Sequence, residues 1–344
     1  MFLSNKFLKS AIITKDSKII DAIKSLNKST IQIVLVEDRN KNFFGTITDG
    51  DIRRALVKGK NLNSKIDSII KKNPYILEKK EDINYVKNIL NKKNIKHLPI
   101  IKNRKIIGVY SSILPVGKSK VIENRLIIMS GGFGRRLGNL TKKTPKGMLL
   151  YKNKPLLEHI ILLAKENGIK NIYLSVYYLK KKIIKYFKNG KKFGLNIKYL
   201  REQRPLGTIG SIRYLKKEKK PFAVINCDVI SNINFDEMFD FHKKSKSIIT
   251  VGLKEFSYEN PYGVIKNLRN KFLAFDEKPI INFKINAGVY IFNNKVIDII
   301  KKNNIKDIHN LINFCQDKKF KISVFPIIED WTDFGLAKKI LRAR

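Results

Sequence analysis

Residues 130–149 read SGGFGRRLGNLTKKTPKGML and follow the apolar run LIIM at 126–129. This pattern predicts a buried strand that leads into a glycine-rich loop, followed by two arginines and, about ten residues later, by Lys146. Glycines let the backbone approach a ligand closely, and unpaired loop amides can point at phosphate oxygens. The guanidinium and ammonium groups add fixed positive charge at the same place. We therefore expect this segment to hold a triphosphate.

The chain downstream of this loop alternates between expected strands and expected helices. Alternation of this kind predicts an α/β fold with a Rossmann-like, mostly parallel sheet, whose ligands bind at the carboxyl ends of the strands. The expected strands are 126–129, 171–176, 222–226 and 247–253, and the expected helices are 155–164, 179–187 and 235–242.

The first third of the chain contains an internal repeat with an offset of about 63 residues. Each unit has an amphipathic helix followed by two short apolar strands. Two β-α-β-β-α units of this size form one α+β module, since neither unit can bury its apolar face alone. The expected helices are 19–26 and 83–90, and the expected strands are 31–36, 43–47, 95–101 and 105–109. The expected domains are a tandem module at 1–117 with units at about 8–60 and 66–117, a linker at 118–124, and a second domain at 125–344.

The repeat carries a family signature. Residues 45–54, GTITDGDIRR, resemble the adenosine-binding signature of CBS domains, and HLPI at 97–100 resembles the entry strand of a second CBS unit. In that family the groups matching the Thr48 hydroxyl and the Asp51 carboxylate hold a ribose, so the resemblance implies a site for an adenine nucleotide. The second unit has Leu114 where the first has Asp51, which argues for a single site of this kind. The alternative role for Asp51 is to cap the helix that follows it.

The glycine-rich segment resembles a second family. Its spacing through Lys146 is similar to the signature GGxGTRL…TPKPML of sugar-nucleotide pyrophosphorylases, and Arg136 and Lys146 fall on that family's two phosphate-contacting cations. The sequence differs from the family pattern at Ser130, Arg135 and Gly147. The resemblance places the nucleotide-binding loop at Gly131, Gly132, Gly134 and Arg135.

Three further motifs of this family follow in its order. RPLGTIG at 204–210 resembles the nucleobase loop, in which Gly207 and Thr208 would contact the base. NCD at 226–228 resembles NGD, whose aspartate binds Mg²⁺, and WTDFG at 331–335 resembles WxDxG, which carries the second metal aspartate. The metal ligands implied by the resemblance are therefore Asp228 and Asp333.

The sugar motifs of the family lie between these elements, at 260–265 (NPYGVI), 275–279 (FDEKP) and 286–290 (NAGVY). Lys278 would hold the sugar phosphate in line for reaction. The sugar-binding residues implied by the resemblance are Tyr262, Gly263, Glu277 and Asn286.

The joint order of these motifs implies a nucleotidyltransferase of GT-A-like fold that joins a nucleoside triphosphate to a sugar 1-phosphate and releases pyrophosphate. Its catalytic residues would be Arg136, Lys146, Asp228, Lys278 and Asp333, with Mg²⁺ as cofactor. The motif at 131–134 is most similar to mannose-1-phosphate guanylyltransferases. The CBS pair ahead of it is similar to the glucosamine-1-phosphate guanylyltransferases of legionaminic acid synthesis. We therefore expect GTP and a hexose or hexosamine 1-phosphate, giving GDP-hexose or a GDP-hexosamine such as GDP-glucosamine.

Other functions remain open at this point. UTP, dTTP or CTP could replace GTP, and the departures Cys227 and Gly147 would suit a ligand-sensing protein with a weakened active site. A net charge of +42 would suit a nucleic-acid-binding protein, but the lysines are spread along the chain as in compositionally biased sequences, so we expect no nucleic-acid partner. The charge should still attract anionic substrates.

The remaining expectations concern location and assembly. No apolar run reaches membrane-spanning length and the first residues lack a signal-peptide core, so we expect no membrane insertion. The two cysteines, Cys227 and Cys315, suit a reducing cytoplasm. Because CBS modules often pair with each other, the resemblance also implies a homo-oligomer.

Overall fold

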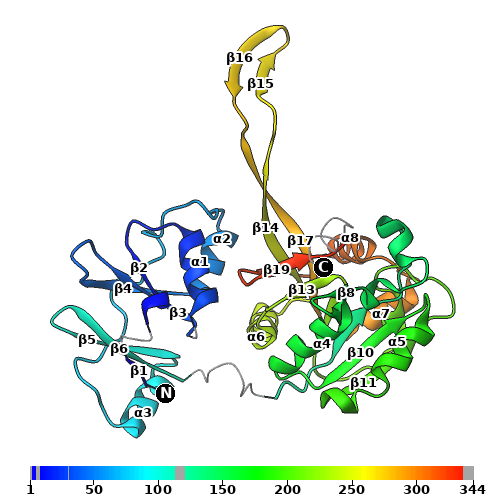
Figure 1. Cartoon of the computed structure of the whole chain (residues 1–344), viewed down its shortest axis with the longest axis horizontal. Helices are drawn as coiled ribbons and strands as arrows, with labels where there is room; N and C mark the ends of the chain where they lie inside the picture. Colours follow the sequence, from blue (N-terminus) through cyan, green and yellow to red (C-terminus); the bar gives the residue numbers. More distant parts are fainter. Residues whose placement is uncertain (1, 5–7, 30, 113–120, 336–344) are drawn as a thin grey trace.

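The strand that precedes the glycine-rich loop lies at the centre of the larger domain. The computed structural model describes residues 2–4, 8–29, 31–112 and 121–335 (Figure 1). Strand β7 (Leu126–Met129) has three completely buried side chains, Leu126, Ile127 and Ile128. A strand buried on both faces requires a sheet that is covered on both sides. We call residues 121–335 the sheet domain.

The central sheet of this domain has seven strands in the order β11-β10-β7-β12-β17-β14-β18. All strands run in one direction except β17, which is antiparallel to both of its neighbours. The expected α/β fold with a mostly parallel sheet is therefore confirmed. The strand bounds are β10 (Asn171–Val176), β11 (Asn196–Arg201), β12 (Phe222–Asn226), β14 (Ile249–Glu259), β17 (Ile280–Phe292) and β18 (Ile322–Pro326).

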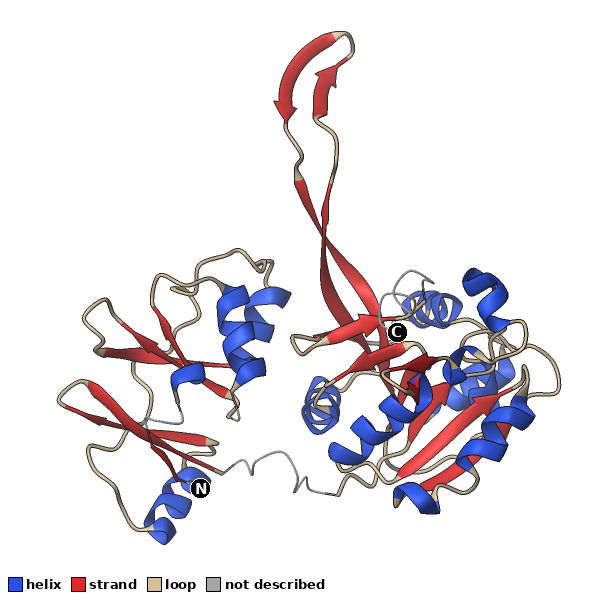
Figure 2. Cartoon of the chain, viewed as in Figure 1, coloured by secondary structure: helices blue, strands red, loops and turns tan. Residues whose placement is uncertain are grey.

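Helices cover the two faces of this sheet, as Figure 2 shows. Leu126 and Ile128 pack with α4, α5 and α6, whereas Ile127 points to the opposite face and packs with α7, α8 and η6. The alternation of side chains along β7 therefore divides the core into two layers. The helices are α4 (Leu156–Glu166), α5 (Lys180–Phe187), α6 (Phe235–Ser245), α7 (Lys295–Lys302), α8 (Ile308–Asp317), η3 (Arg135–Thr141), η4 (Lys146–Met148), η5 (Lys191–Phe193) and η6 (Gly210–Tyr214).

The sequence expectations for the domain match these elements closely, with one informative exception. The strand expected at 247–253 continues as β14 to Glu259, because β14 pairs with β17 beyond the edge of the sheet. The paired strands form a ribbon that also carries the hairpin of β15 (Val264–Leu268) and β16 (Lys271–Asp276) at its tip. We call residues 254–284 the arm; it projects well beyond the rest of the molecule (Figure 1). Short pairs complete the domain: β8 (Leu150–Tyr151) with β9 (Lys154–Pro155), and β13 (Val229–Ser231) with β19 (Trp331–Asp333).

The repeat forms a separate module, described over 2–112 with gaps, which we call the repeat module. One three-stranded sheet, β2-β3-β4, comes from the first sequence repeat, and the other, β1-β6-β5, joins β1 near the N-terminus to two strands of the second repeat. The end of the second unit, residues 113–117, and residues 118–120 of the linker expected at 118–124 lie outside the described residues. The elements are β1 (Phe2–Ser4), η2 (Lys9–Ala11), β2 (Ile12–Thr14), α1 (Ile19–Lys28), β3 (Ile33–Glu37), β4 (Phe43–Thr48), α2 (Asp49–Val57), α3 (Ile83–Lys92), β5 (His97–Lys102) and β6 (Lys105–Ser111).

The module and the sheet domain meet at a joint centred on Arg53 of α2. The Arg53 guanidinium is buried, pairs with Glu329 at 2.8 Å, donates to the Pro326 carbonyl and lies 4.2 Å from the centroid of the Phe325 ring. Glu237 of α6 joins this group. A buried arginine of this kind depends on its acidic partners, because an unpaired buried charge is strongly destabilising.

Glu237 makes the joint sensitive to pH. Burial, followed by the hydrogen bond and charge of Asp49, raises the pKa of Glu237 to about 8, although Lys96 at 3.1 Å and Arg53 at 3.9 Å oppose the shift. The folded protein therefore keeps a proton that the unfolded chain loses near its ordinary pKa of 4.5. Stability from this group is complete below pH 4.5 and is lost as the pH rises towards 8.

We predict that the melting temperature falls between pH 6 and pH 8.5 (roughly the range over which the carboxyl loses its proton), and that Glu237→Gln reduces this fall. The amide retains hydrogen bonding but does not titrate. Glu166→Gln, at an exposed position of α4, is the matched control and should follow the wild type. Thermal denaturation followed by circular dichroism across this range tests the prediction, and identical curves for Glu237→Gln and the wild type would contradict it.

Gly147 is required by packing between η4 and α4. A Cβ atom built at Gly147 would lie 2.6 Å from Leu157 Cγ, and Leu157 is itself completely buried. The neighbouring helix therefore leaves no room for a side chain at this position. Gly147, at which the sequence differs from the family pattern, is therefore compatible with the close approach of Leu157.

We predict that Gly147→Ala lowers the free energy of unfolding by about 1–3 kcal/mol through overpacking. Leu157→Ala alone should cost about 2–5 kcal/mol through the cavity it leaves. The double variant should be more stable than the sum of the two effects, because the new methyl group enters the space that Leu157 vacates. Urea denaturation of the four proteins measures the coupling, and strict additivity would show that the two side chains do not compete for space.

Candidate active site

Several of the expected site residues gather where the strand order of the sheet reverses. From β7 the chain moves outward to β10 and β11 and then returns to β12 on the other side of β7. Open α/β sheets bind ligands at such a switch point, beyond the carboxyl ends of the strands. Met129 lies opposite Asn226, and the Cys227 amide donates to the Met129 carbonyl at 3.3 Å. The glycine-rich loop and Asp228 therefore leave the sheet side by side.

Two carboxylates converge beside this switch point. Strands β13 and β19 pair so that Val229 lies opposite Asp333, and the Phe334 amide donates to the Asp228 carbonyl at 2.8 Å. A Cβ atom built at Gly335 would lie 2.9 Å from Asp333 Oδ1 and 3.3 Å from Asp228 Oδ2. Both carboxylates thus border one point that only a glycine leaves accessible.

This donor set fits Mg²⁺, which proteins hold with one or two carboxylates while substrate phosphates and water complete the octahedron. The described residues contain no cluster of three or more His, Cys, Asp or Glu side chains that could form a larger cage. The arrangement therefore suits an ion that arrives together with a phosphate ligand.

Lys146 is brought to the same place by the glycine-rich loop. Its ammonium pairs with Asp228 Oδ2. Gly134 adopts a φ of 70°, and a Cβ there would meet Thr141 Cγ2 at 2.8 Å and Lys146 Cβ at 3.4 Å. The loop can close over the lysine because this position has no side chain. Lys146, Asp228 and Asp333 therefore form one connected group.

The other loop residues line the approach to this group. Arg135 and Arg136 are exposed at the start of η3, and the Arg135 guanidinium lies 5.4 Å from the centroid of the Phe133 ring. Gly132 is exposed, and an added Cβ would have no described heavy atom within 4 Å. The loop thus presents cations and bare backbone to solvent.

Sequence reasoning missed a buried acid beneath this loop, Glu202. Glu202 is 2% exposed and accepts hydrogen bonds from Ser175 Oγ at 2.6 Å and from the Leu206 amide at 3.0 Å. A Cβ atom built at Gly131 would lie 2.6 Å from Glu202 Oε1, so the backbone of the phosphate loop packs directly on this acid. Glu202 therefore joins the phosphate loop to the expected nucleobase loop. It follows β11 in a polar stretch, REQR, that offers no signal of burial.

The expected nucleobase loop is held by Asp307, at the start of α8. The Thr208 amide donates to Asp307 Oδ1 at 3.0 Å, and Thr208 Oγ1 accepts from the Ile308 amide at 3.0 Å. Gly207 adopts a φ of 73°, and a Cβ there would lie 2.7 Å from the Lys306 carbonyl oxygen. Residues far apart in the sequence therefore set the position of this loop.

Of the expected sugar-binding residues, the structure places Asn286 beside the acidic pair. Its amide nitrogen donates to Tyr290 Oη at 2.7 Å. Burial is the main cause that raises the pKa of Tyr290, and the Asp228 charge acts in the same direction. The Trp331 indole donates to the Ala287 carbonyl at 2.9 Å and ties β19 to this strand.

The other expected sugar-site residues lie on the arm. Tyr262 is 75% exposed, and Gly263 packs its backbone against the Phe275 ring. Glu277 and Lys278 precede β17 at the far end of the ribbon. In one chain these residues do not join the group formed by Lys146, Asp228 and Asp333.

In the repeat module, the two expected ligand residues bind each other. Thr48 is the N-cap of α2, and Asp51 Oδ2 accepts from the Thr48 amide at 2.9 Å and its hydroxyl at 2.7 Å. This capping box realises the alternative role of Asp51. A cavity of about 290 Å³ lies beside it, between the two units. Its lining includes Thr48, Asp49, Lys71, Tyr75, Lys96 and His97.

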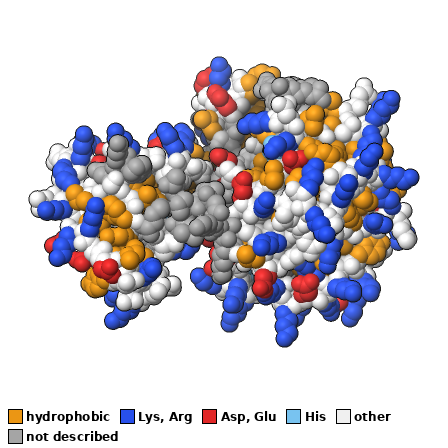
Figure 3. Space-filling model, turned by 60° about the horizontal axis from the view of Figure 1, so that its bottom comes forward, with side chains coloured by type: hydrophobic (Ala, Val, Ile, Leu, Met, Phe, Trp, Pro, Cys, Tyr) orange, Lys and Arg blue, Asp and Glu red, His pale blue; other side chains and the backbone are white. Residues whose placement is uncertain are grey.

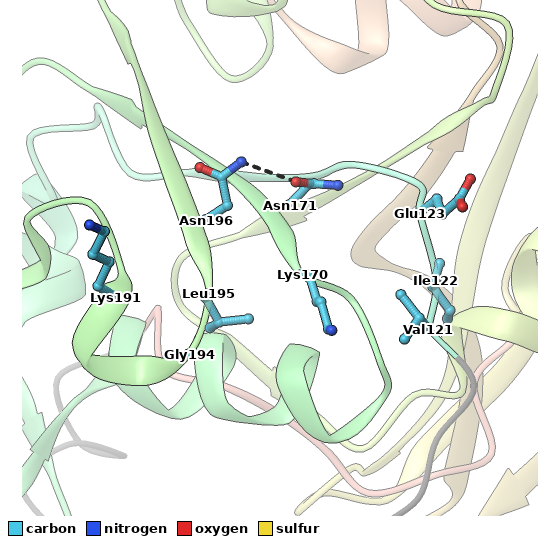
Figure 4. A pocket seen from close by; sticks show the side chains of 9 residues that line it. All are labelled: Val121, Ile122, Glu123, Lys170, Asn171, Lys191, Gly194, Leu195 and Asn196. Carbon is cyan, nitrogen blue, oxygen red and sulfur yellow. Dashed lines mark hydrogen bonds between the residues drawn. The ribbon is translucent and has the colours of Figure 1, made fainter.

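A larger depression of about 450 Å³ lies elsewhere, at the amino ends of β10 and β11 (Figure 4). Asn171 and Asn196, which begin these strands, share a hydrogen bond of 3.2 Å across it. It belongs to the opposite edge of the sheet from the carboxylate pair. Lysine and arginine side chains cover the face seen in Figure 3 without forming one stripe.

Two further observations limit the chemistry of the chain. Burial raises the pKa of the Cys227 thiol to about 12, so this residue beside Asp228 is not an activated nucleophile. Among the described helices, none combines the length and the apolar character that a membrane span requires.

Comparisons with known proteins agree with this geometry. The family model of nucleotidyl transferases matches residues 125–344, and the CBS-domain model matches 9–58 and 66–112. The chain is 37% identical over 183 residues to a mannose-1-phosphate guanyltransferase of Yarrowia lipolytica, covering 51% of this chain and 50% of the relative. It is 33% identical over 228 residues to the mannose-1-phosphate guanyltransferase of Saccharomyces cerevisiae, covering 62% of each.

The chain therefore spans between 50% and 62% of the length of these two curated relatives. Among solved structures, HddC from Yersinia pseudotuberculosis has the same fold, with a TM-score of 0.50 and 22% identity over 64% of this chain and 97% of HddC. The chain belongs to the nucleotidyl transferase family and carries a pair of CBS domains ahead of its nucleotidyl transferase domain.

Proposed function

We propose that this chain is a sugar-1-phosphate nucleotidyltransferase that uses GTP. The observation that carries the proposal is the convergence of Asp228 and Asp333 beside Gly335, with Lys146 paired to the same acid under the glycine-rich loop. The named activity of the relatives, mannose-1-phosphate guanyltransferase, supports guanine as the base. The proposed product is a GDP-hexose or a GDP-hexosamine such as GDP-glucosamine. The proposed domains of the chain are 1–117 and 125–344.

In the proposed reaction, a phosphate oxygen of the sugar 1-phosphate attacks the α-phosphorus of the triphosphate. A new phosphorus–oxygen bond forms while the bond to the bridging oxygen of the β-phosphate breaks, and pyrophosphate leaves with the electron pair. Because both reactants are polyanions, their repulsion is the main obstacle. Positioning and charge stabilisation therefore do most of the catalytic work.

The chain supplies those positions and charges. The Lys146 ammonium, which pairs with Asp228 in the ligand-free chain, can pair with phosphate oxygens instead. Arg136 is exposed at the mouth of the loop. Glu202 keeps the phosphate and base loops together. Asp228 and Asp333 would hold Mg²⁺, which offsets the negative charge of the triphosphate when bound. Two buried free thiols suit the reducing cytoplasm that we propose as the location.

We predict that Asp228→Asn lowers turnover at least about 100-fold, as loss of a group that stabilises developing charge commonly does, without unfolding the protein. The control is Asp330→Asn, which removes the same charge from an exposed position after β18. Pyrophosphate release from GTP with mannose or glucosamine 1-phosphate and Mg²⁺ measures the effect. Near-wild-type turnover of Asp228→Asn at saturating Mg²⁺ would exclude the proposed role.

The choice of base is tested with the wild type, by measuring pyrophosphate release from UTP, dTTP and CTP in parallel with GTP.

We also propose that the CBS pair binds an adenine nucleotide and thereby regulates the transferase. Asp49 and Lys96 line the cavity of the module, and both face Glu237 of α6. Arg53 connects the same group to Glu329, close before the strand that carries Asp333. A ligand that draws Lys96 towards its phosphate would therefore weaken the joint next to the active site.

We predict that AMP, ADP or ATP binds the full chain and that Lys71→Ala weakens this binding about 5- to 10-fold, about 1–1.4 kcal/mol for a charge-assisted contact. Lys71 lines the cavity but does not take part in the joint. Lys58→Ala, at an exposed position after α2, is the matched control. Isothermal calorimetry measures both variants, and absence of heat with all three nucleotides would rule out adenine-nucleotide sensing.

A further inference from the structure

The arm has one apolar face. In the register of β14 and β17, Phe256 lies opposite Phe283 and Tyr258 lies opposite Ile281. Side chains at alternate positions of paired strands share a face, so these four side chains form one patch. Each of them is between 39% and 47% exposed, although all four are large and apolar or aromatic. The hairpin at the tip also exposes apolar side chains: Ile265 lies opposite Phe275, and both are more than half exposed.

The opposite face of the arm is mainly polar. Glu255 lies opposite Lys284, Ser257 opposite Asn282, and Glu259 opposite Ile280, which is the one apolar side chain among these six. At the base of the arm, the Lys284 ammonium donates to the Leu56 carbonyl of the repeat module at 3.1 Å. The chain therefore engages the polar face and leaves the apolar face uncovered. A two-stranded ribbon is only marginally stable by itself, and an exposed apolar patch marks an interface.

The arm also separates residues that the proposed function requires together. Asn286 lies beside the acidic pair, whereas Glu277 and Lys278 lie beyond Ile280 at the other end of the ribbon. The extended run from Ile280 to Asn286 spans roughly 20 Å at the usual rise of a strand. The active site of one chain therefore lacks the sugar-site residues of the arm.

A second copy of the chain would cover the apolar face of the arm and would also supply the sugar-site residues that the active site of one chain lacks. Lys254 and Ile285 begin this face at the base of the ribbon, and the two rungs beyond them on the same face, Phe256–Phe283 and Tyr258–Ile281, carry no charge. Two identical patches can therefore meet without the repulsion that a net charge of +42 otherwise imposes. Two-fold symmetry brings identical patches together. In an antiparallel pair of arms, the tip of each arm lies at the base of the other, and the base is where Asn286 and Asp228 lie.

We propose that two copies of this chain pair through the apolar faces of their arms, and that each arm completes the sugar site of the partner with Glu277 and Lys278. The pairing follows from the ribbon alone, whereas the shared site rests on the proposed function. Two experiments test these parts separately.

The first experiment measures the mass of the full chain in solution. The double variant Phe256→Asp and Phe283→Asp places two like charges on the self-facing patch and should convert a dimer into a monomer. The double variant Ser257→Asp and Asn282→Asp adds the same charges to the polar face of neighbouring rungs and should remain a dimer. Sedimentation velocity at micromolar concentration reports the mass without any need for activity.

The second experiment tests the shared site by complementation. Chains with Asp228→Asn and chains with Lys278→Ala carry different affinity tags, are co-expressed, and are purified through both tags. If arms are exchanged, the active-site cleft of the Lys278→Ala chain receives an intact arm, and each mixed dimer should show about half the wild-type turnover. Each variant purified alone should be inactive.

Several outcomes would overturn the proposal. A monomeric wild type, or a dimer that survives the Phe256→Asp and Phe283→Asp change, refutes pairing through the arm. Wild-type monomers that sediment with phosphatidylglycerol vesicles through the same face would assign the patch to a membrane instead. Mixed dimers at the background rate, with an active wild type, show that each arm serves its own chain. An inactive wild type refutes the proposed function, while the mass measurement still decides the pairing.

Discussion

The pairing of β7 with β12 is the constraint on which the site depends. With Met129 opposite Asn226, the two strands end at the same height, and the loops that follow them must share the space above the sheet. One loop brings glycines and Lys146, and the other brings Asp228. A shift of the register by one residue would turn Asp228 to the other face of the sheet and separate the charges. The fully buried side chains of β7 hold this register, because the core on both faces would have to repack.

Several charges of the site and of the joint are already paired before any ligand binds. Lys146 pairs with Asp228 in the site, Arg53 pairs with Glu329 in the joint, and the buried acid Glu202 accepts hydrogen bonds from a hydroxyl and an amide. Buried or half-buried charges need such partners, since desolvation otherwise costs several kcal/mol. The Lys146–Asp228 pair is exchangeable, because a phosphate can replace a carboxylate as the partner of a lysine. The features that stabilise the ligand-free fold therefore also prepare it for anionic substrates.

The arm and the joint extend the site beyond one compact domain. The joint connects α2 of the repeat module to α6 and to the segment before β19, while the arm leaves the sheet between these elements. The repeat module contacts the sheet domain at both places. Its Leu56 carbonyl accepts from Lys284 of the arm, and its Arg53 donates to the Pro326 carbonyl at the joint. Any change in the position of the repeat module would therefore act on the arm and on the acidic strand together.

The sequence by itself determined the fold class and most elements of both domains, because buried strands and amphipathic helices leave clear periodic patterns. It also pointed to Lys146, Asp228 and Asp333, which stand in motifs that directly follow such strands, and the structure brings these three together. Only the tertiary structure revealed Glu202 and Asp307, whose roles depend on contacts with residues distant in the chain. It alone placed Tyr262, Glu277 and Lys278 on an arm, because strand pairing beyond the sheet edge, rather than local sequence, sets where a hairpin points.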